Sequence, residues 1–225
     1  FIPSAVVATG LLAALADAAQ RERWLMPLLS GETVAVLAHE EDDVALSAGP
    51  LRTQARRSGD GWRLDGAKSG IYHAAAADLL LVSATLAEGG TGVFAVPAGS
   101  AGLSLQGWAT VDGQRAADLR LDGVELAADA RLGGDGDAAA ALQQALDRGL
   151  AALCADAIGS LDRILQATIE YSRARVQFGV PLSTFQALRH QLVDVYIAHE
   201  SARGMVTRLL ADVPDPEIPI LNVIE

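Results

Sequence analysis

Hydrophobic residues recur at helical spacing near the start of the chain. Over residues 5–29 the apolar positions lie three or four apart, as on one face of a helix. Pro27 and the Ser30-Gly31 pair end this run. The pattern therefore predicts helical structure over 5–29. The positions that carry it are Val7, Leu11, Leu12, Leu15, Trp24, Leu25 and Leu28.

The pattern changes over residues 31–133. Short apolar runs are separated there by turn signals such as Gly59-Asp60-Gly61 and Asp122-Gly123. Short strands at this spacing are typical of an antiparallel β-barrel or sandwich. The runs are TVAVLAH, GWRLDG, DLLLVSA, GVFAVPA, LSLQGWA and ADLRLDGVEL.

Helical spacing returns over residues 138–212. One long segment runs from Ala138 to about Gln177, and a second runs from Leu182 to Ala211. The predicted fold class is α+β, mainly helical, with an antiparallel β-barrel between two helical parts. The expected domains are the end of an N-terminal helical domain, a middle β domain and part of a C-terminal helical domain, over 1–30, 31–133 and 134–225.

The composition is that of a folded, acidic chain. Of the 225 residues, 51% are hydrophobic and 20% are charged, and the formal net charge is −11. This sign argues against nucleic acid and an anionic membrane as partners, since both attract a basic face. The apolar opening is too short to cross a bilayer, and no basic stretch precedes it as in a signal peptide. Because the chain begins with Phe1 rather than Met, we expect an internal portion of a longer protein.

Most signatures of catalysis and ligand binding do not occur in the sequence. It contains no Walker loop, no dinucleotide glycine fingerprint after a strand and no nucleophile elbow. Cys154, the only cysteine, lies in an apolar run and is interpreted as a buried hydrophobe rather than a reactive thiol. No metal site is predicted, because the four histidines do not fall at metal-ligand spacing. They are His39, His73, His190 and His199.

The stretch YSRARVQFGVPLSTFQ, which begins at Tyr171, separates the two long helical segments. One interpretation is purely structural: its two arginines suit the negative end of a helix dipole, Gly179 caps that helix, and Pro181 begins the next one. The same residues also favour a ligand. Arginine, the free N–H groups of a helix start and the aromatic face of Phe178 suit the pyrophosphate and adenine of a dinucleotide.

Residues 175–186, RVQFGVPLSTFQ, resemble the R-x-Q-F-G-x-P-[LI]-x-x-F-Q signature of the acyl-CoA dehydrogenase family. A second stretch, GDGWRLDGAKSGIYHAAAADLLLVSA, is similar to the family's G-x-x-x-L-N-G-x-K-x-[WY]-I-[TS]-N-A-x-x-A-D segment. The resemblance extends from Leu11 to about Ala211 and includes the order of the predicted domains. Finer similarity is to the branch of pimeloyl-CoA dehydrogenase small subunits and of heteromeric steroid acyl-CoA dehydrogenases of actinobacteria.

The resemblance implies a function and a cofactor. Members of the family use FAD to introduce an α,β double bond into an acyl-CoA thioester, and they pass electrons to electron-transfer flavoprotein. It also implies a cytoplasmic homo- or hetero-oligomer, a dimer of dimers, with a role in fatty acid metabolism and lipid degradation. In the family, the signature's Arg and Phe reach the FAD of a neighbouring subunit. The residues carried over to that role are Arg175, Gln177, Phe178, Leu182, Phe185 and Gln186.

The part of the site that faces the flavin ring departs from the family pattern. The family's T-E-P-x-x-G-S-D loop corresponds to HEEDD, residues 39–43, which lacks the Pro and the Gly-Ser pair. The family's ring-contacting Trp-x-Thr pair corresponds to Gly70 and Tyr72. His39 and Tyr72 are carried over as ring-side FAD contacts. Acidic residues near the cofactor would repel its phosphate, and the alternative, favoured if the chain binds flavin elsewhere, is that they form a solvated loop. Either the subunit binds FAD by altered contacts, or it completes a partner's site and is itself catalytically silent.

The oxidation needs a carboxylate that removes the α-proton while the β-hydride leaves. Most members of the family supply a Glu near the C-terminus, and a minority supply a carboxylate from a motif similar to L-x-E-R. The corresponding stretch here is ALDRG, which makes Asp147 the candidate base. The alternative is an ordinary surface charge pair of Asp147 with Arg148.

Overall fold

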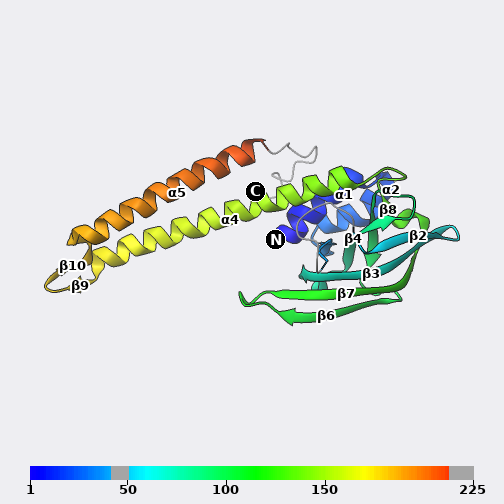
Figure 1. The fold of residues 1–225 in the computed structure, drawn as a ribbon, viewed down its shortest axis with the longest axis horizontal. Helices are drawn as coiled ribbons and strands as arrows, with labels where there is room; N and C mark the ends of the chain where they lie inside the picture. The colour runs from blue at the N-terminus through cyan, green and yellow to red at the C-terminus, as the bar shows by residue number, and fades with distance from the viewer. Residues whose placement is uncertain (42–50, 213–225) are drawn as a thin grey trace. The chain divides into compact units, whose positions relative to one another are not determined.

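The computed structural model describes residues 1–41 and 51–212, which are drawn as ribbons in Figure 1. They form two compact units, Phe1–Gly149 and 150–212. The first unit contains the N-terminal helices and the sheet, and the second is a helical hairpin. The long helix α4, Ala139–Ala174, contributes residues to both units. The three-domain division of the sequence stays a prediction.

The N-terminal helices confirm the helical structure expected over 5–29, with one interruption. Ala16 is extended, and Asp17 begins a new helix by forming a capping box with Gln20. The Gln20 amide also donates to the carbonyls of Asp129 and Arg131, both at 2.9 Å, which fastens this helix to the far end of the sheet. The elements are η1 Ile2–Ala8, α1 Thr9–Leu15, α2 Ala18–Gln20, η2 Arg21–Leu25 and α3 Met26–Leu29, with η1 and η2 π-helical.

One sheet of eight strands follows, in the order β6-β7-β3-β2-β4-β5-β8, with β1 paired to β4. The β1–β4 and β2–β4 pairs are parallel and the others are antiparallel, so the sheet differs from the wholly antiparallel arrangement that the pattern predicted. The reason is that β2 and β3 lie between β1 and β4 along the chain, which gives the long connection that a parallel pair needs. The strands are β1 Ala35–Ala38, β2 Gln54–Ser58, β3 Gly61–Tyr72, β4 Leu79–Leu86, β5 Thr91–Pro97, β6 Leu103–Ala109, β7 Arg115–Leu126 and β8 Arg131–Leu132, with 3₁₀ turns η3 Ala74–Ala76 and η4 Ala128–Ala130.

The sheet buries both of its faces around β4 and β5. Leu80 and Phe94 belong to the core inside the barrel, whereas Leu81 and Val93 pack with the N-terminal helices on the other face. Burial on both faces explains why these strands read as continuous apolar runs rather than as alternating ones. The first unit therefore has a complete core of its own.

The second unit is a hairpin of two long helices. It contains the rest of α4, a two-stranded ribbon, a 3₁₀ turn and a final helix. The two predicted helices are confirmed, but the first ends at Ala174 and the second begins at Gln186. Pro181, which was expected to start the second helix, lies in a strand instead. The elements are β9 Val176–Gln177, β10 Val180–Pro181, η5 Leu182–Thr184 and α5 Gln186–Asp212.

Candidate cofactor-binding site

The chain reverses between α4 and α5 through a two-residue turn. Gln177 pairs with Val180 across it, so that Phe178 and Gly179 form the turn. Their φ angles are 52° and 83°. Two consecutive residues with positive φ match a type I′ hairpin turn. Gly179 is therefore a turn residue here and not the helix cap that the sequence suggested.

Phe178 is costly in this position. A bulky residue with positive φ is strained by roughly 1–3 kcal/mol, and such strain clusters at functional sites. The side chain recovers nothing from burial, since it is 92% exposed. Its ring contacts that of Phe185 edge-on, with the ring centroids 6.3 Å apart. An aromatic side chain held outward by its own backbone indicates a surface that binds a ligand or a partner.

The other residues of the signature lie in the same turn. The Leu182 N–H donates to the Arg175 carbonyl at 2.9 Å, which closes the ribbon against the end of α4. Arg175 and Gln177 are exposed, and Gln186 is the first residue of α5. The first turn of a helix has N–H groups without partners inside the helix. We name this group of residues the arginine corner; its members are Arg175, Gln177, Phe178, Leu182, Phe185 and Gln186.

The arginine corner has the donor set that a dinucleotide diphosphate requires. A guanidinium, helix N–H groups and an exposed aromatic ring are its chemical complement. The sequence motif and the described geometry are thus compatible with the phosphate and adenosine end of FAD.

The ring-side candidates in the first unit differ from each other in exposure. His39 is only 2% exposed, and its Nδ1 lies 2.9 Å from the Oγ of Ser83, a buried residue of β4. Tyr72 ends β3 and is exposed, next to His73, which has a φ of 62°. Gly70, which the resemblance aligns with the family's Trp, donates its N–H to Asp118 Oδ1 at 2.8 Å. Of the two carried-over residues, only Tyr72 presents its side chain at the surface.

Glu41 and Lys68, each two residues from a ring-side position (His39 and Gly70), form a buried ion pair. Lys68 Nζ donates to Glu41 Oε1 at 2.8 Å, and their side chains are 0% and 4% exposed. Lys68 also donates to the His39 carbonyl at 3.0 Å and lies 3.3 Å from Ser83 Oγ. Glu41 accepts three further hydrogen bonds, from the N–H groups of Arg52 and Thr53 and from the Thr53 hydroxyl. The Glu41 carboxylate therefore faces inward and does not repel a ligand as a solvated charge would.

The sequence pattern missed this pair, although it contained a signal. Lys68 is the only lysine among the 17 lysine and arginine residues of the chain. A lysine in a chain that otherwise uses arginine is a signal that this position requires an ammonium group. An ammonium is compact and donates in three directions, whereas a guanidinium is planar and larger. The three acceptors around Lys68, contributed by Glu41, His39 and Ser83, fit the ammonium group.

The environment shifts the pKa of both partners. Burial would raise the pKa of Glu41, but the hydrogen bonds from Lys68 and Thr53, the charge of Lys68 and the Arg52 N–H outweigh it and lower the pKa to about 2. Burial lowers the pKa of Lys68 to about 8, against the opposing effect of Glu41. Glu41 is thus ionised throughout the neutral range.

Asp147 lies near the start of α4, in the first unit. It is exposed, and one of its carboxylate oxygens accepts a hydrogen bond from Gln143 Nε2 at 2.9 Å. The described residues therefore do not form a poorly solvated cleft around it. Arg148 follows it in the sequence, but Asp147 and Arg148 do not form an ion pair with each other in the described chain.

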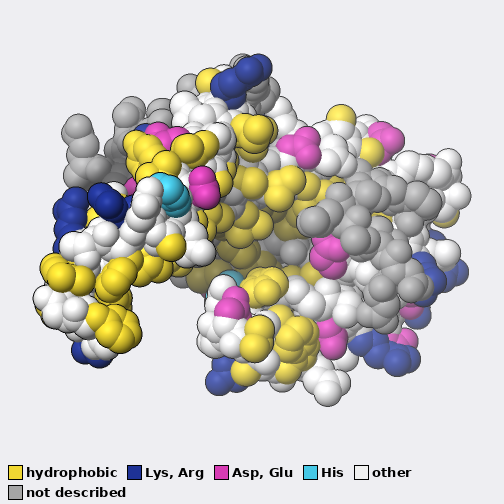
Figure 2. Space-filling view, turned by 60° about the vertical axis from the view of Figure 1, so that its left-hand side comes forward, with side chains coloured by type: hydrophobic (Ala, Val, Ile, Leu, Met, Phe, Trp, Pro, Cys, Tyr) yellow, Lys and Arg dark blue, Asp and Glu magenta, His cyan; other side chains and the backbone are white. Residues whose placement is uncertain are grey.

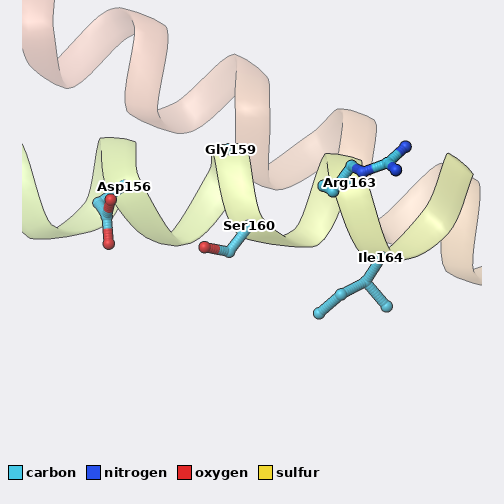
Figure 3. A pocket seen from close by; sticks show the side chains of 5 residues that line it. All are labelled: Asp156, Gly159, Ser160, Arg163 and Ile164. Atoms are coloured by element: carbon cyan, nitrogen blue, oxygen red, sulfur yellow. The ribbon is translucent and has the colours of Figure 1, made fainter. Parts of the chain in front are cut away.

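Further along α4 several large apolar side chains are exposed, among them Leu153, Leu161 and Ile164. A depression of about 530 Å³ lies on this helix, and its five lining residues, labelled in Figure 3, all belong to α4. Ile164, at its edge, is 62% exposed, and a Cβ added at Gly159 would meet no atom within 4 Å. Figure 2 shows hydrophobic side chains on the outer surface of the hairpin as well. An open apolar face of this kind is suited to packing against another helix rather than to enclosing a small molecule.

Within residues 1–41 and 51–212, no helix combines the length and hydrophobicity that a membrane span requires. No group of three or more His, Cys, Asp or Glu side chains in that part of the chain is arranged to hold a metal ion.

Comparison with known proteins identifies the family. The profile of the acyl-CoA dehydrogenase C-terminal domain matches residues 136–219. The chain is 31% identical over 196 residues to the human mitochondrial short-chain specific acyl-CoA dehydrogenase, covering 84% of this chain and 48% of that protein. It is 32% identical over 210 residues to acyl-CoA dehydrogenase FadE27 of Mycobacterium tuberculosis, covering 92% and 53%.

Solved structures agree in fold. Glutaryl-CoA dehydrogenase from Mycobacterium smegmatis superposes with a TM-score of 0.87 at 26% identity, covering 97% of this chain and 58% of that one. A variant of the Tcur3481–Tcur3483 steroid acyl-CoA dehydrogenase gives 0.79 at 36% identity, covering 93% and 55%. The ChsE4–ChsE5 complex from Mycobacterium tuberculosis gives 0.78 at 30% identity, covering 94% and 56%.

These matches, together with the signature in the arginine corner, place the chain in the acyl-CoA dehydrogenase family. The chain spans about half the length of the curated relatives that it matches.

Proposed function

We propose that this chain is part of an FAD-dependent acyl-CoA dehydrogenase that introduces an α,β double bond into an acyl-CoA thioester and passes the electrons to electron-transfer flavoprotein. The observation that carries the proposal is the arginine corner. Phe178 is strained and 92% exposed beside Arg175 and a helix start, as a dinucleotide contact requires.

The corner would hold the FAD of a neighbouring subunit. Arg175 would pair with the diphosphate, and Phe178 would contact the adenosine. The apolar surface of the hairpin supports an oligomer, a dimer of dimers, because a monomer rarely leaves so many large apolar side chains in water. The cytoplasmic location and the role in lipid degradation belong to the same proposal.

FAD, when bound, supplies the acceptor for the hydride that leaves the β-carbon. The chain's own candidate for the base is Asp147, whose carboxylate would accept the α-proton. A base works best when it is partly desolvated. Asp147 is exposed in the described chain, so in this proposal a partner subunit or the bound thioester covers it.

The second candidate function is a catalytically silent subunit that completes a partner's FAD site. Two observations favour it: the ring-side positions hold Gly70 and Tyr72, and His39 is buried against Ser83 rather than presented at the surface. Relatives whose structures were solved as the ChsE4–ChsE5 complex and the Tcur3481–Tcur3483 steroid enzyme are consistent with a heteromer. In this case the substrate of the whole heteromer is a steroid acyl-CoA, as the name of the Tcur3481–Tcur3483 steroid enzyme suggests.

The flavin stoichiometry of the purified full-length protein tests the proposal. One FAD for each chain, in protein expressed alone, supports the active subunit. Flavin that is retained only after co-expression with a homologous subunit supports the silent one. A protein that binds no FAD in either preparation would contradict both functions.

A further inference from the structure

The buried ion pair of Glu41 and Lys68 joins parts of the chain that are far apart in the sequence. Glu41 lies three residues after β1, and it accepts hydrogen bonds from the N–H groups of Arg52 at 2.7 Å and Thr53 at 3.1 Å. These residues stand on the two sides of 42–50. One carboxylate thus holds together the chain that enters this segment and the chain that leaves it.

Lys68 connects strand β3 to Glu41 and to the residues before it. Besides Glu41, it binds the His39 carbonyl at 3.0 Å, and the neighbouring Ser69 N–H donates to the Glu40 carbonyl at 2.9 Å. Residues 39–41 are therefore fixed to β3 at positions 68 and 69. Gly70 and Tyr72 follow at once on the same strand. The pair connects the two segments that correspond to the family's ring-side contacts.

Close packing around the pair makes the geometry specific. Gly66 has a φ of 151°, and a Cβ at this position would come within 2.6 Å of Thr53 Cα. No other residue fits there without moving Thr53, whose hydroxyl lies 2.6 Å from Glu41 Oε1. The carboxylate accepts from two backbone N–H groups, those of Arg52 and Thr53, and from the buried side chains of Thr53 and Lys68, so its position is strongly constrained.

We propose that Glu41 and Lys68 are positioning residues for the ring side of the FAD site. They do not touch the cofactor. Their ion pair sets the distance between residues 39–41 and residues 70–72, and the Glu41 carboxylate also holds the N–H groups of Arg52 and Thr53. The inference rests on the proposed function, because it assigns these two segments to a flavin.

The test compares three variants of the full-length protein, prepared with its partner subunit where it has one. Glu41→Gln keeps the shape of the side chain and removes its charge. Glu41→Gln/Lys68→Met removes both charges and avoids a lone buried ion, which protects the test from a variant that fails to fold. Glu125→Gln is the control, since it breaks an exposed ion pair with Arg63, 3.5 Å long, on the same sheet.

The first readout is independent of FAD. Lys68 is the only lysine in the 225 residues, so acylation of its peptide by an amine-reactive reagent reports opening of the pair. We expect Lys68 to be acylated at least about tenfold faster in Glu41→Gln, with the N–H groups of Arg52 and Thr53 exchanging faster by a similar factor. Unchanged protection of all three groups would show that the pair does not hold the chain together.

The second readout is the FAD dissociation constant. We expect it to rise by at least about tenfold in Glu41→Gln and in the double variant, and by less than about twofold in Glu125→Gln. An unchanged constant in a Glu41→Gln protein whose Lys68 is deprotected would overturn the positioning role and leave the proposed function intact. A wild-type protein that binds no FAD would overturn both.

Discussion

The sheet unit and the helical hairpin treat charge and hydrophobic surface in opposite ways. In the sheet unit, Trp62 and Phe94 are fully buried, and even an ion pair, Glu41–Lys68, is enclosed. In the hairpin, Phe178, Ile164 and Met205 are exposed on their own chain. The difference indicates that the first unit has an enclosed core of its own, whereas the second exposes apolar surface of the kind that packs against another protein.

The largest expected effect is on the enclosed pair. Lys68→Met leaves the Glu41 carboxylate buried without its cation, so the free energy of unfolding should fall by about 3–5 kcal/mol. The matched change in the hairpin, Arg203→Met, breaks a solvent-accessible ion pair with Glu200, 2.5 Å long. It should lower the free energy of unfolding by less than about 1 kcal/mol. Urea unfolding followed by far-UV circular dichroism measures both, because the signal includes the helices of the hairpin as well as the sheet unit, whereas all three tryptophans lie in the sheet unit. Equal losses in the two variants would remove the contrast between the units.

The pH dependence of stability sharpens the same contrast. Folding lowers the pKa of Glu41 from 4.5 to about 2, a difference that corresponds to roughly 3 kcal/mol of stability. Because the folded pKa is the lower one, this stability is present above about pH 4.5 and is lost as the pH falls to about 2. Urea unfolding across this range should show the loss in the wild type. The same curve in Glu41→Gln should be flatter by about that amount, and parallel curves would contradict the assignment.

The next effect is on chemistry. If the subunit is active, Asp147→Asn should keep FAD and acyl-CoA binding and lower turnover by at least about 100-fold, the usual scale for a general base. Asp156→Asn, an exposed carboxylate on the same helix, is the control and should leave turnover within about twofold. Near-normal turnover of Asp147→Asn would assign proton removal to a residue outside the described chain or in a partner.

A smaller effect is expected on assembly. Ile164→Asp places a charge on the open face of α4, where the side chain is 62% exposed in the single chain. If this face packs against another subunit, the dissociation constant of the oligomer should rise by at least about tenfold, with the helix content unchanged. Gln166→Asp adds the same charge at an exposed polar position of the helix. Sedimentation velocity that gives equal association for both variants would show that Ile164 is not in an interface.

The repetition of apolar residues was enough to predict most of the fold. Both long helices and six of the strands follow from spacing alone, because apolar residues recur along each of them at intervals typical of its kind of element. β2 was not predicted, since its sequence QARRS has one buried residue, Ala55, and is held by its neighbours rather than by its own hydrophobicity. The turn at Phe178 was interpreted as a helix cap, because Gly suits both and only the backbone distinguishes them.

The candidate site was predictable where a linear motif carries it and not where tertiary contacts do. The arginine corner is contiguous, so its six residues appear together in the sequence and in the structure. Glu41 was interpreted as part of a solvated acidic loop. Its true partners are Lys68 on β3 and the pair Arg52 and Thr53 just before β2, and no spacing rule connects them with Glu41. The burial of His39 has the same origin.

The central claim is that the arginine corner holds an FAD diphosphate across a subunit interface, and equilibrium titration of FAD against Arg175→Ala tests it most directly. Loss of one charge-assisted phosphate contact costs roughly 1.5–3 kcal/mol, so the dissociation constant should rise by about 10- to 150-fold with fold and oligomer unchanged. Arg208→Ala, an exposed arginine on α5, should change it by less than about twofold. A dissociation constant for Arg175→Ala equal to that of the wild type would contradict the account.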